Sequence, residues 1–481
     1  MSTNKQSFST NKTERIKEYF EAIALQRSKW KEKSKYYHQK IEQLFRFLIP
    51  EGKKVLEIGC GTGDLLDAVK PRYGVGIDIS EKMIKIAKKN YKRLNFKAQD
   101  AQNLQINEGF DYVIMTDVIG NFEDVQRAFE QLHKVSNEKT RIIVTYYNFL
   151  WESILNFAER IGFKMPQPLQ NWLAGKDIEN LLSLANLEVI KKGSIILIQV
   201  YIPIISNFFN KYIAQLPLFK NLCLTSYFIV RKIPNVYSNT EYSVSVIIPA
   251  RNEEGSIEQA VIRMPKLGRS TELIFVEGGS KDNTLKEIKR VIQKYKNKKS
   301  LILIDQGKAT GKGDAVRKGF TKASGEILMI LDADLTVAPE DLPKFYHVLR
   351  SGKAEFIMGS RLVYPMEKEA MRFLNILGNK FFGLAFSFLL DTSIKDTLCG
   401  TKVLFKRDYE EIARNRSYFG DFDPFGDFDL IFGAAKLNLK ILEIPIRYKA
   451  RIYGITNISR FKHGLHLFRM LLFAMRKFKF I

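Results

Sequence analysis

Cysteine is scarce in this sequence, and no long hydrophobic run is present. The three cysteines, Cys60, Cys223 and Cys399, stand far apart and show no CxxC spacing. Neither a disulfide framework nor a zinc site is therefore indicated, and a reducing cytoplasm is the expected compartment. The nearest approach to a membrane span, Ser194–Ser206, is interrupted by a glutamine and a proline. It is shorter than the roughly 18 to 20 apolar residues that a span needs, and it predicts a buried strand pair instead.

Targeting signals and repeats are missing as well. The first residues, MSTNKQSFSTNKTER, are polar and lack the apolar core of a signal peptide. Neither a low-complexity tract nor a repeat with a period of about 20 to 50 residues is visible. We therefore expect a globular protein that is cytoplasmic, either soluble or peripheral on the inner face of the cell membrane.

What the sequence has in excess is positive charge. Its 481 residues carry a formal net charge of +24, and the excess is spread evenly, with 35 basic and 24 acidic residues up to Thr240. An even spread is not a basic tail. It suits anionic partners such as nucleotides, lipid phosphates, an anionic membrane face or nucleic acid. The length exceeds that of one ordinary core, so two or three domains are expected.

A glycine-rich turn follows the first predicted strand. The stretch KKVLEIGCGTGDLL, residues 53–66, reads as a short apolar strand, a turn with glycines at 59, 61 and 63, and the start of a helix. Glycine permits positive φ angles and lets a ligand approach the backbone closely. The dinucleotide fingerprint GxGxxG would need a glycine where this chain has Asp64, and this argues against NAD. A βα turn without a ligand is the alternative interpretation.

Acidic residues mark the ends of the next strands. The first strand contains Glu57, and the predicted second, third and fourth strands end near Asp78, Asp100 and Asp117. A fifth strand is predicted over Arg141–Tyr147. Helical patterns lie between the strands, so we expect an α/β fold with a doubly wound parallel sheet, whose ligands bind at the carboxyl ends of the strands. The four carboxylates would then meet at one edge of the sheet.

The ExGxGxG turn, the acidic end of the second strand and the Asp-Ala pair after the third resemble the class I S-adenosylmethionine-dependent methyltransferases, over about residues 36–190. The resemblance implies that the glycines border the methionine part of the cofactor, that Asp78 binds the ribose hydroxyls, and that Asp100 and Ala101 border the adenine. The cofactor-binding residues expected in these motifs are Glu57, Gly59, Gly61, Gly63, Asp78, Asp100, Ala101 and Asp117.

In the second half, two aspartates follow a strand-like run. A new series of strands, loops and helices begins near Tyr242, and MILDADL, residues 329–335, places Asp332 and Asp334 directly after apolar residues. In such a fold they lie at the carboxyl end of the sheet, with a solvated structural loop as the alternative. Two carboxylates there can hold Mg²⁺ or Mn²⁺ and leave positions for phosphate oxygens, and the ion can neutralise a leaving diphosphate. Without the ion, the two like charges are expected to repel each other.

Residues 242–470 resemble the family 2 glycosyltransferases with the GT-A fold, of the polyprenyl-phosphate sugar synthase type. IIPARNEE matches the first nucleotide-contacting loop, DAD matches the metal-binding Asp-x-Asp, and VEGGSKDNT matches the family's Val-Asp-Asp-Gly-Ser loop. In that last loop Glu277 and Gly278 replace the two aspartates, which leaves the identity of the nucleotide open. The metal ligands implied are Asp332 and Asp334. The substrate-binding residues implied are Pro249, Arg251, Glu253, Glu277, Lys312, Asp332, Arg361 and Arg451.

Two further features bear on the sugar acceptor. Asp427 and Asp429 are expected to act as a base or to position the sugar, with a helix N-cap as the alternative. An alcohol acceptor needs a base, whereas a lipid phosphate is already ionised at neutral pH. The apolar stretch Asn375–Leu390 and the basic, apolar end of the chain favour helices in the membrane interface. Core packing explains their apolar residues equally well.

Together these patterns predict a bifunctional transferase, with a Rossmann-like methyltransferase in residues 1–235 and a GT-A glycosyltransferase in residues 241–481. The polar, proline-bearing segment 231–242 is the expected linker. The expected cofactors are S-adenosylmethionine and Mg²⁺ or Mn²⁺. The expected partners are a nucleotide-diphosphate sugar and a polyprenyl phosphate or glycolipid at the membrane surface, and no nucleic acid.

Two rival hypotheses remain at this stage. One is a nucleic-acid methyltransferase whose second half only docks. Enzymes that methylate amino groups of nucleic acid typically carry Asn/Asp-Pro-Pro-aromatic after the fourth strand, where this chain has TDVI. The other is a membrane-recruitment protein with two degenerate sites, which only the Glu277-Gly278 replacement supports.

Overall fold

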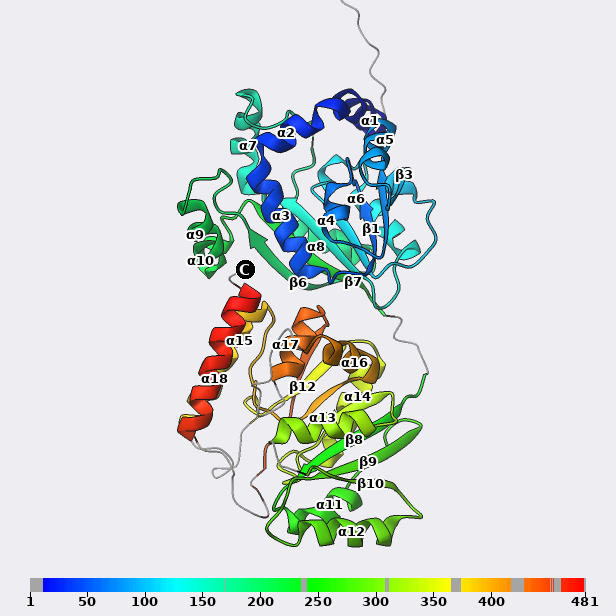
Figure 1. Cartoon of the computed structure of the whole chain (residues 1–481), viewed down its shortest axis with the longest axis vertical. Coiled ribbons are helices and arrows are strands. Elements are labelled where there is room, and N and C mark those ends of the chain that lie inside the picture. Colours follow the sequence, from blue (N-terminus) through cyan, green and yellow to red (C-terminus); the bar gives the residue numbers. More distant parts are fainter. Residues whose placement is uncertain are drawn as a thin grey trace, which may run out of the picture. The chain divides into compact units, whose positions relative to one another are not determined.

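The chain forms two compact units, Met1–Ile233 (unit 1) and Pro234–Lys479 (unit 2), drawn in Figure 1 from the computed structural model. The structure describes residues 12–168, 170–234, 240–307, 311–364, 373–416, 428–449, 451, 453 and 460–479. Within these residues each unit contains a seven-stranded sheet with helices on both faces. The predicted α/β class, with two successive sheet domains, is confirmed.

The sheet of unit 1 has the strand order β3-β2-β1-β4-β5-β7-β6. Its strands are β1 (Lys54–Ile58), β2 (Tyr73–Asp78), β3 (Asn95–Ala98), β4 (Tyr112–Thr116), β5 (Arg141–Tyr147), β6 (Leu187–Ile195) and β7 (Thr225–Lys232). The first five are parallel to one another, as predicted, whereas β7 runs antiparallel to both β5 and β6. The strand order reverses between β1 and β4, and ligands of such sheets bind at the carboxyl ends of the strands beside that switch point.

Helices cover both faces of this sheet. They are α1 (Lys12–Ile23), α2 (Arg27–Lys33), α3 (Lys35–Leu48), α4 (Asp64–Ala68), α5 (Glu81–Asn90), α6 (Val125–Gln131), α7 (Glu152–Arg160), α8 (Gly175–Leu184), α9 (Ile205–Lys211) and α10 (Pro217–Lys220). Apolar residues of α6 and α8 pack with the sheet in one core cluster. Residues of α3, α4 and α5 pack against the opposite face in a second cluster. The Ser80 side chain caps α5 by accepting from the Met83 N–H.

The prediction of a buried strand pair over Ser194–Ser206 is wrong. Strand β6 ends at Ile195, and the chain turns where Ile196 and Ile204 adopt positive φ angles of 67° and 66°. A positive φ is incompatible with strand geometry. The apolar side chains that were expected inside the protein, Val200, Tyr201, Ile202, Ile204 and Ile205, are exposed.

The sheet of unit 2 has the order β10-β9-β8-β11-β13-β12-β14. Its strands are β8 (Ser243–Ala250), β9 (Ser270–Glu277), β10 (Ser300–Asp305), β11 (Ile327–Ile330), β12 (Phe356–Ser360), β13 (Lys402–Phe405) and β14 (Ile441–Pro445). The first four strands in chain order are parallel, while β13 is antiparallel to β11 and β12. Because β11 ends at Ile330, Asp332 and Asp334 lie directly beyond its carboxyl end.

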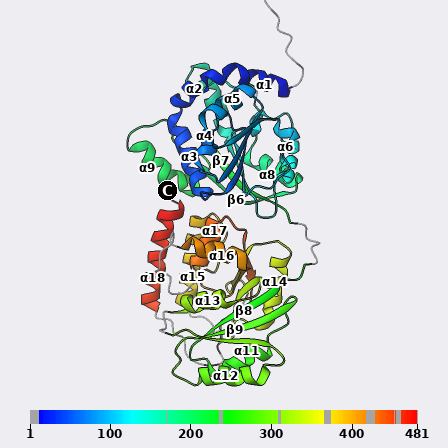
Figure 2. The same ribbon diagram turned by 45° about the vertical axis from the view of Figure 1, so that its right-hand side comes forward.

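The helices of unit 2 are α11 (Ile257–Ile262), α12 (Thr284–Tyr295), α13 (Lys312–Lys322), α14 (Leu342–Arg350), α15 (Phe373–Leu390), α16 (Lys406–Arg414), α17 (Phe428–Lys436) and α18 (Arg460–Ala474). Residues of α11, α12 and α14 form one core with the sheet. Figure 2 shows α13 on the side of β8 and β9 that faces away from α12. Gly319 of α13 lies so close to Ile247 of β8 that a Cβ atom would collide with it.

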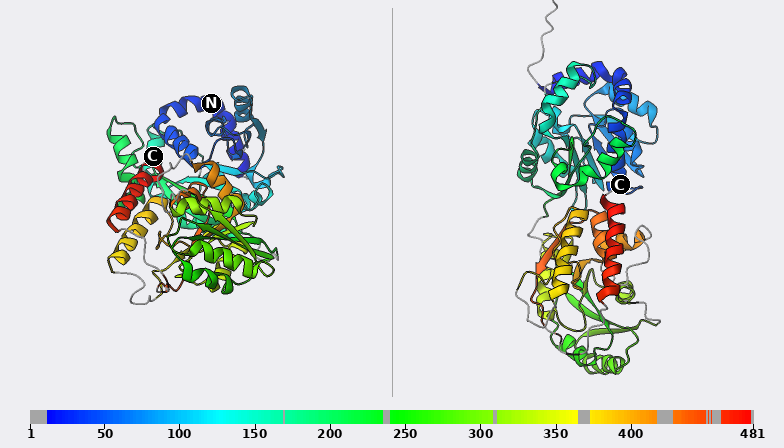
Figure 3. Two further views of the ribbon diagram at one scale, coloured as in Figure 1. Left: turned by 60° about the horizontal axis from the view of Figure 1, so that its bottom comes forward. Right: turned by 90° about the vertical axis from the view of Figure 1, so that its left-hand side faces the viewer.

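Helices α15 and α18 pack against each other, as the yellow and red ribbons of Figure 3 show. One side of α15 is buried through Phe386, Leu389 and Leu390. The other side exposes Leu377, Phe381 and Leu384, and α18 exposes Leu465, Phe468 and Leu472. Core packing therefore explains the buried side of α15, and contact of the exposed side with a membrane interface stays a prediction. Among the helices of the described chain, none combines the length and the apolarity needed to cross a membrane.

Candidate functional site

Unit 1 contains a cavity of about 1430 Å³ at the carboxyl ends of its parallel strands. Helices α1, α2 and α3 and the segments after β1, β2, β3 and β4 line it. The cavity brings together most of the residues that the sequence predicted for a cofactor, namely Glu57, Gly59, Gly61, Asp78, Asp100, Ala101 and Asp117. Gly63 is not part of the lining. It packs against Phe96, and a Cβ atom there would lie 2.7 Å from the Phe96 ring.

The glycine turn leaves open space beside Gly61. This residue has a φ of +52°, and a Cβ atom built on it would meet no atom within 4 Å. Its N–H donates to Asp78 Oδ2 at 2.9 Å, and the Ser80 N–H donates to Asp78 Oδ1 at 2.9 Å. Burial raises the pKa of Asp78 above its usual range, against the effect of these two hydrogen bonds. The turn and the carboxylate of Asp78 are thus held together as one rigid edge of the cavity.

Glu57 is the least satisfied carboxylate of this edge. Its side chain is buried, and its Oε2 atom has no hydrogen-bond partner in the described structure. Burial raises its pKa to about 8, against the nearby charge of Lys31, and the carboxylates of Asp64 and Asp78 raise it further. A buried oxygen without a partner is costly. A cationic or N–H-bearing ligand in the cavity would supply the missing partner.

Asp117 lies at the end of β4 with a positive φ of 53°. Tyr37 Oη donates to its Oδ2 at 2.5 Å, and Thr145 Oγ1 donates to its Oδ1 at 3.2 Å. Burial raises the pKa of Asp117 to about 6, although the hydrogen bonds from Tyr37 and Thr145 oppose the shift. On the neighbouring side of the cavity, Asp100 accepts a hydrogen bond from the Gln102 N–H at 2.9 Å.

Sequence reasoning missed the contribution of the N-terminal helices to this cavity. Tyr37 of α3 contacts Asp117, and Lys31 of α2 donates to Thr62 at 3.1 Å and pairs with Asp64. These helices precede the glycine turn and carry no motif of their own. The amphipathic pattern of α3 was the available signal, but it indicates only that one face is buried.

In unit 2 each of the two aspartates after β11 has its own cation. Lys312 Nζ lies 2.6 Å from Asp332 Oδ1, and Arg451 Nη2 lies 2.7 Å from Asp334 Oδ2. Burial opposes ionisation of Asp332, but the charge of Lys312 and its hydrogen bond hold the pKa of this carboxyl below its usual range. The expected repulsion between two bare carboxylates is therefore wrong, because Lys312 and Arg451 neutralise them.

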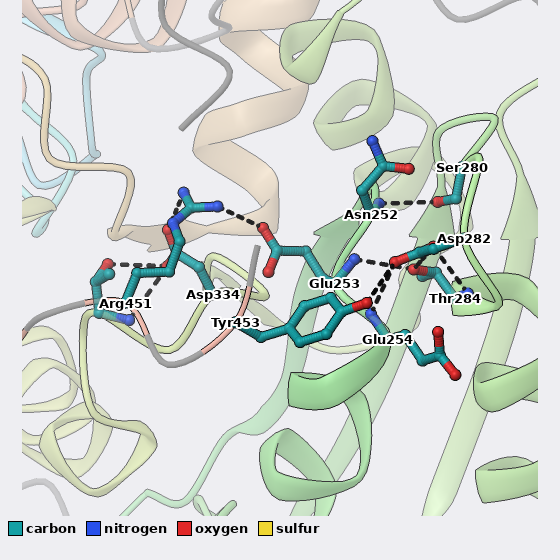
Figure 4. A network of polar contacts seen from close by, with 10 residues as sticks. Asn252, Glu253, Glu254, Ser280, Asp282, Thr284, Asp334, Arg451 and Tyr453 are labelled. Carbon is teal, nitrogen blue, oxygen red and sulfur yellow. Dashed lines mark hydrogen bonds and ion pairs between the residues drawn. The ribbon is translucent and has the colours of Figure 1, made fainter. Parts of the chain in front are cut away.

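Figure 4 shows Arg451 bridging Asp334 and Glu253, which come from different loops. Arg451 Nη1 lies 2.9 Å from Glu253 Oε1. Burial raises the pKa of Glu253 to about 7, against the charge of Arg451, and the charges of Asp334 and Asp332 raise it further. Thr336 donates to Asp334 through its N–H and its hydroxyl, at 3.2 and 2.9 Å. The predicted residues Glu253, Asp334 and Arg451 thus form one network.

The other predicted substrate residues lie in different surroundings. Pro249 is half-buried in β8, and Arg251 beyond it is exposed. Glu277 folds back on its own loop and accepts from the N–H groups of Ser280 at 2.6 Å and Gly279 at 3.1 Å. Its carboxylate therefore shapes the loop in which it stands.

Arg361 is held in a buried ion pair. Its Nε and Nη2 atoms lie 2.7 and 2.8 Å from the two carboxylate oxygens of Asp396, a bidentate geometry. Asp429 lies in the first turn of α17, 3.4 Å from Arg416 Nε and 4.0 Å from Arg317 Nη1. Asp427 lies outside the described residues. Sequence reasoning missed Asp396, because a lone aspartate between two elements shows no sign of the arginine with which it pairs.

The donor set after β11 fits a hard divalent cation that also takes oxygens from a substrate. In the described parts of the chain, no group of three or more His, Cys, Asp or Glu side chains is arranged to hold a metal by itself. Asp332 and Asp334 supply the one or two carboxylates that Mg²⁺ commonly takes from a protein when phosphates complete its coordination. In this structure Lys312 and Arg451 pair with the two aspartates and supply the positive charge of the site.

Comparison with known proteins assigns a different family to each half. The model of a methyltransferase domain matches residues 30–192, and that of glycosyl transferase family 2 matches residues 245–413. The dolichol-phosphate mannosyltransferase of Pyrococcus furiosus is 28% identical over 236 residues, which cover 47% of this chain and 63% of that protein. The human dolichyl-phosphate beta-glucosyltransferase is 28% identical over 236 residues, covering 45% of this chain and 70% of that protein.

Among solved structures, a SAM-dependent methyltransferase of Thermotoga maritima is 19% identical, with a TM-score of 0.36, over 45% of this chain and 100% of that chain. The predicted assignment to two transferase families is confirmed by the two family models. Residues 30–192 therefore match a methyltransferase domain, and residues 245–413 match a domain of glycosyl transferase family 2.

Proposed function

We propose that this protein transfers a methyl group from S-adenosylmethionine in unit 1 and a sugar from a nucleotide-diphosphate sugar to a lipid phosphate in unit 2. The observation that supports it best is that each sheet carries its own acidic site at the carboxyl ends of its parallel strands. One site is a deep cavity with a buried, unsatisfied carboxylate. The other is a pair of aspartates held by two cations.

The cavity of unit 1 suits a positively charged cofactor. S-adenosylmethionine carries an ammonium group and a sulfonium whose methyl carbon is electrophilic. Glu57 Oε2 would accept from the ammonium, Asp78 would accept from the ribose hydroxyls, and the open space beside Gly61 would admit the methionine part. Asp100 and Ala101 would border the adenine. Asp117, oriented by Tyr37, is ionised above about pH 6 and would accept the proton that a neutral acceptor loses.

In unit 2, Asp332 and Asp334 would hold Mg²⁺ or Mn²⁺ together with the diphosphate of the sugar donor, and the ion would neutralise the leaving diphosphate. Lys312 and Arg451, which pair with these carboxylates in this structure, would contact the phosphates of the donor, where their charge helps the diphosphate to leave. A lipid phosphate is already ionised, so this reaction requires no base, and Asp429 would position the sugar.

Two substitutions in the full chain separate the two activities. Gly61→Val should abolish methyl transfer and leave sugar transfer unchanged, because its side chain would fill the space for the cofactor and a β-branched residue is strained at a φ of +52°. Asp334→Asn should abolish Mn²⁺-dependent sugar transfer to polyprenyl phosphate and leave methyl transfer unchanged, because a neutral amide is a poor ligand for a hard cation. Asp341→Asn, at a partly exposed ion pair with Lys344, is the matched control for unit 2. Retained Mn²⁺-dependent sugar transfer by Asp334→Asn would refute the metal site.

Asp334→Asn should also lower the stability of unit 2 by about 1.5–3 kcal/mol, since a largely buried, charge-assisted hydrogen bond to Arg451 is lost. Arg451 keeps Glu253 as a partner, which favours the lower end of that range. Circular dichroism during urea unfolding measures the change. A more stable variant would show that repulsion between the aspartates outweighs their pairing with Lys312 and Arg451.

A further inference from the structure

The opening of the cavity in unit 1 is apolar. Seven large apolar side chains line the cavity and are also exposed to solvent, so they mark where it opens: Leu25, Ile154, Phe157, Ile161, Phe163, Val200 and Tyr201. Leu25 is 82% exposed and Phe163 is 76% exposed. Exposed apolar side chains are normal when they are scattered singly, but a contiguous group marks a surface that meets another apolar surface.

This rim continues into a second apolar region, residues 196–224, which we call the apolar insertion. It joins β6 to β7, which are adjacent antiparallel strands, and such strands need only about two to five connecting residues. The insertion contains no aspartate or glutamate, and its charged residues are Lys211 and Lys220. Its exposed apolar side chains are Val200, Tyr201, Ile202, Ile204, Ile205, Phe208, Phe209, Tyr212, Leu216, Leu218 and Leu222.

Polar contacts hold the apolar insertion in place on its inner side. Asn210 Oδ1 accepts from the N–H groups of Leu197 and Ile198 at 2.7 and 2.8 Å, and its Nδ2 donates to Ile198 O at 2.7 Å. Asn210 Nδ2 also donates to Tyr36 Oη at 3.1 Å. Trp151 Nε1 donates to Leu222 O at 2.9 Å. The insertion therefore has a satisfied polar side toward the rest of unit 1 and an apolar side toward solvent.

Its chemistry matches the headgroup boundary of an anionic bilayer. Aromatic side chains, aliphatic side chains and lysine without any acidic residue are the composition of segments that lie in that boundary, and the net charge of +24 adds long-range attraction to anionic lipid. Figure 1 shows α7, α9 and α10 along one edge of unit 1, near α2 and α3, which line the cavity. A surface that binds lipid would therefore reach the cavity opening.

The size of the cavity leaves room for a second molecule. Sites for one drug-sized ligand measure about 300–1,000 Å³, and this cavity measures about 1430 Å³. We propose that the apolar insertion lies in the headgroup region of an anionic bilayer and that the methyl acceptor is a lipid-borne molecule. Its polar end enters the cavity, and its apolar chain stays in the bilayer beside Phe163 and Val200. This proposal rests on the proposed methyl transfer by unit 1.

The first test locates unit 1 at the bilayer through its tryptophans. All three tryptophans of the chain, Trp30, Trp151 and Trp172, belong to unit 1, so their fluorescence does not report contacts made by α15 and α18. The full chain is mixed with phosphatidylcholine–phosphatidylglycerol vesicles that contain brominated phosphatidylcholine. Quenching is expected, and Trp151→Phe should remove most of it while Trp172→Phe retains it. Absence of quenching in the unchanged chain overturns the proposal.

The second test identifies the class of acceptor. The full chain is incubated with methyl-labelled S-adenosylmethionine and either the lipid extract or the aqueous extract of the source cells. Label is expected in the lipid extract. Phe208→Ser combined with Leu218→Ser should reduce labelling in vesicles by roughly tenfold or more, because removing each large apolar side chain from the bilayer weakens membrane binding by about a factor of ten. Leu184→Ser, at a 63% exposed position of α8 on the other face of the sheet, is the matched control.

Equilibrium dialysis with labelled cofactor distinguishes a failure of the proposed methyl transfer from a failure of the proposed lipid-borne acceptor. All serine variants should bind S-adenosylmethionine as the unchanged chain does. Failure of the unchanged chain to bind it would refute methyl transfer itself, whereas the quenching result would still decide the membrane contact. The lipid-borne acceptor is refuted if the chain binds the cofactor but labels only the aqueous extract, and if the double substitution leaves that labelling unchanged.

Discussion

Glu57→Gln should change how the stability of unit 1 depends on pH. Glu57 is buried at the end of β1, its Oε2 atom has no partner, and burial raises its pKa from 4.5 to about 8, with Asp64 and Asp78 adding to the shift and Lys31 opposing it. Folded Glu57 is therefore protonated at neutral pH, whereas the unfolded chain has already ionised it. Glutamine has the same shape as the protonated side chain and cannot ionise.

The sign and size of the effect follow from proton linkage. Because the pKa is raised on folding, the stability that Glu57 contributes is fully present below about pH 4.5 and is lost as the pH rises through about 8. Within that window folding binds one proton, which costs about 1.4 kcal/mol per pH unit. Between pH 6.5 and 7.5, where folded Glu57 is mostly protonated and the unfolded residue is ionised, unchanged unit 1 should lose about 1.2 kcal/mol more than Glu57→Gln does.

Urea unfolding of the full chain followed by tryptophan fluorescence measures this difference, because every tryptophan lies in unit 1. With a urea dependence of about 2–3 kcal/mol/M, the gap between the two midpoints should change by about 0.5 M between the two pH values. Titration of Asp117 contributes equally to both proteins and cancels. Glu138→Gln, at an exposed position, should follow the unchanged chain. Parallel midpoints for Glu57→Gln and the unchanged chain would refute a protonated Glu57.

Three further predictions concern other parts of the molecule. Asp78→Ala should weaken S-adenosylmethionine binding by roughly 1.5–3 kcal/mol, by loss of charge-assisted hydrogen bonds to the ribose, and unchanged affinity in calorimetry would remove the ribose assignment. Arg361→Lys should destabilise unit 2 by about 2 kcal/mol in urea unfolding, since a lysine cannot form the bidentate contact with buried Asp396; equal stability would show that charge alone matters there. Separate fragments 1–235 and 240–481 should bind S-adenosylmethionine and hydrolyse a nucleotide sugar, respectively, and aggregation of both would contradict the boundary.

The sequence by itself was sufficient for the fold class and for the grouping of four carboxylates at one edge of the first sheet. Strand ends are readable because apolar runs stop at polar residues, and parallel strands place those ends together. This is why Glu57, Asp78, Asp100 and Asp117 could be assigned to one edge from spacing alone, and the structure places all four in one cavity. The pair Asp332 and Asp334 was found by the same reasoning, directly after β11.

Only the tertiary structure decided which charges meet. Lys312 precedes Asp332 by 20 positions, and Arg451 follows Asp334 by 117, so no local pattern connects them. Their pairing depends on how separate loops fold over the strand ends, and it replaced an expected repulsion by neutral ion pairs. In the same way Tyr37 reaches Asp117 from a helix that precedes the first motif.

The sequence also did not determine whether an apolar segment is buried or exposed. Ser194–Ser206 has the composition of a buried strand, yet β6 ends at Ile195. Positive φ angles at Ile196 and Ile204 turn the chain away from the sheet. Apolar side chains are more stable out of water, but the packing partners in the folded chain decide whether such a segment is buried in a core or stays exposed.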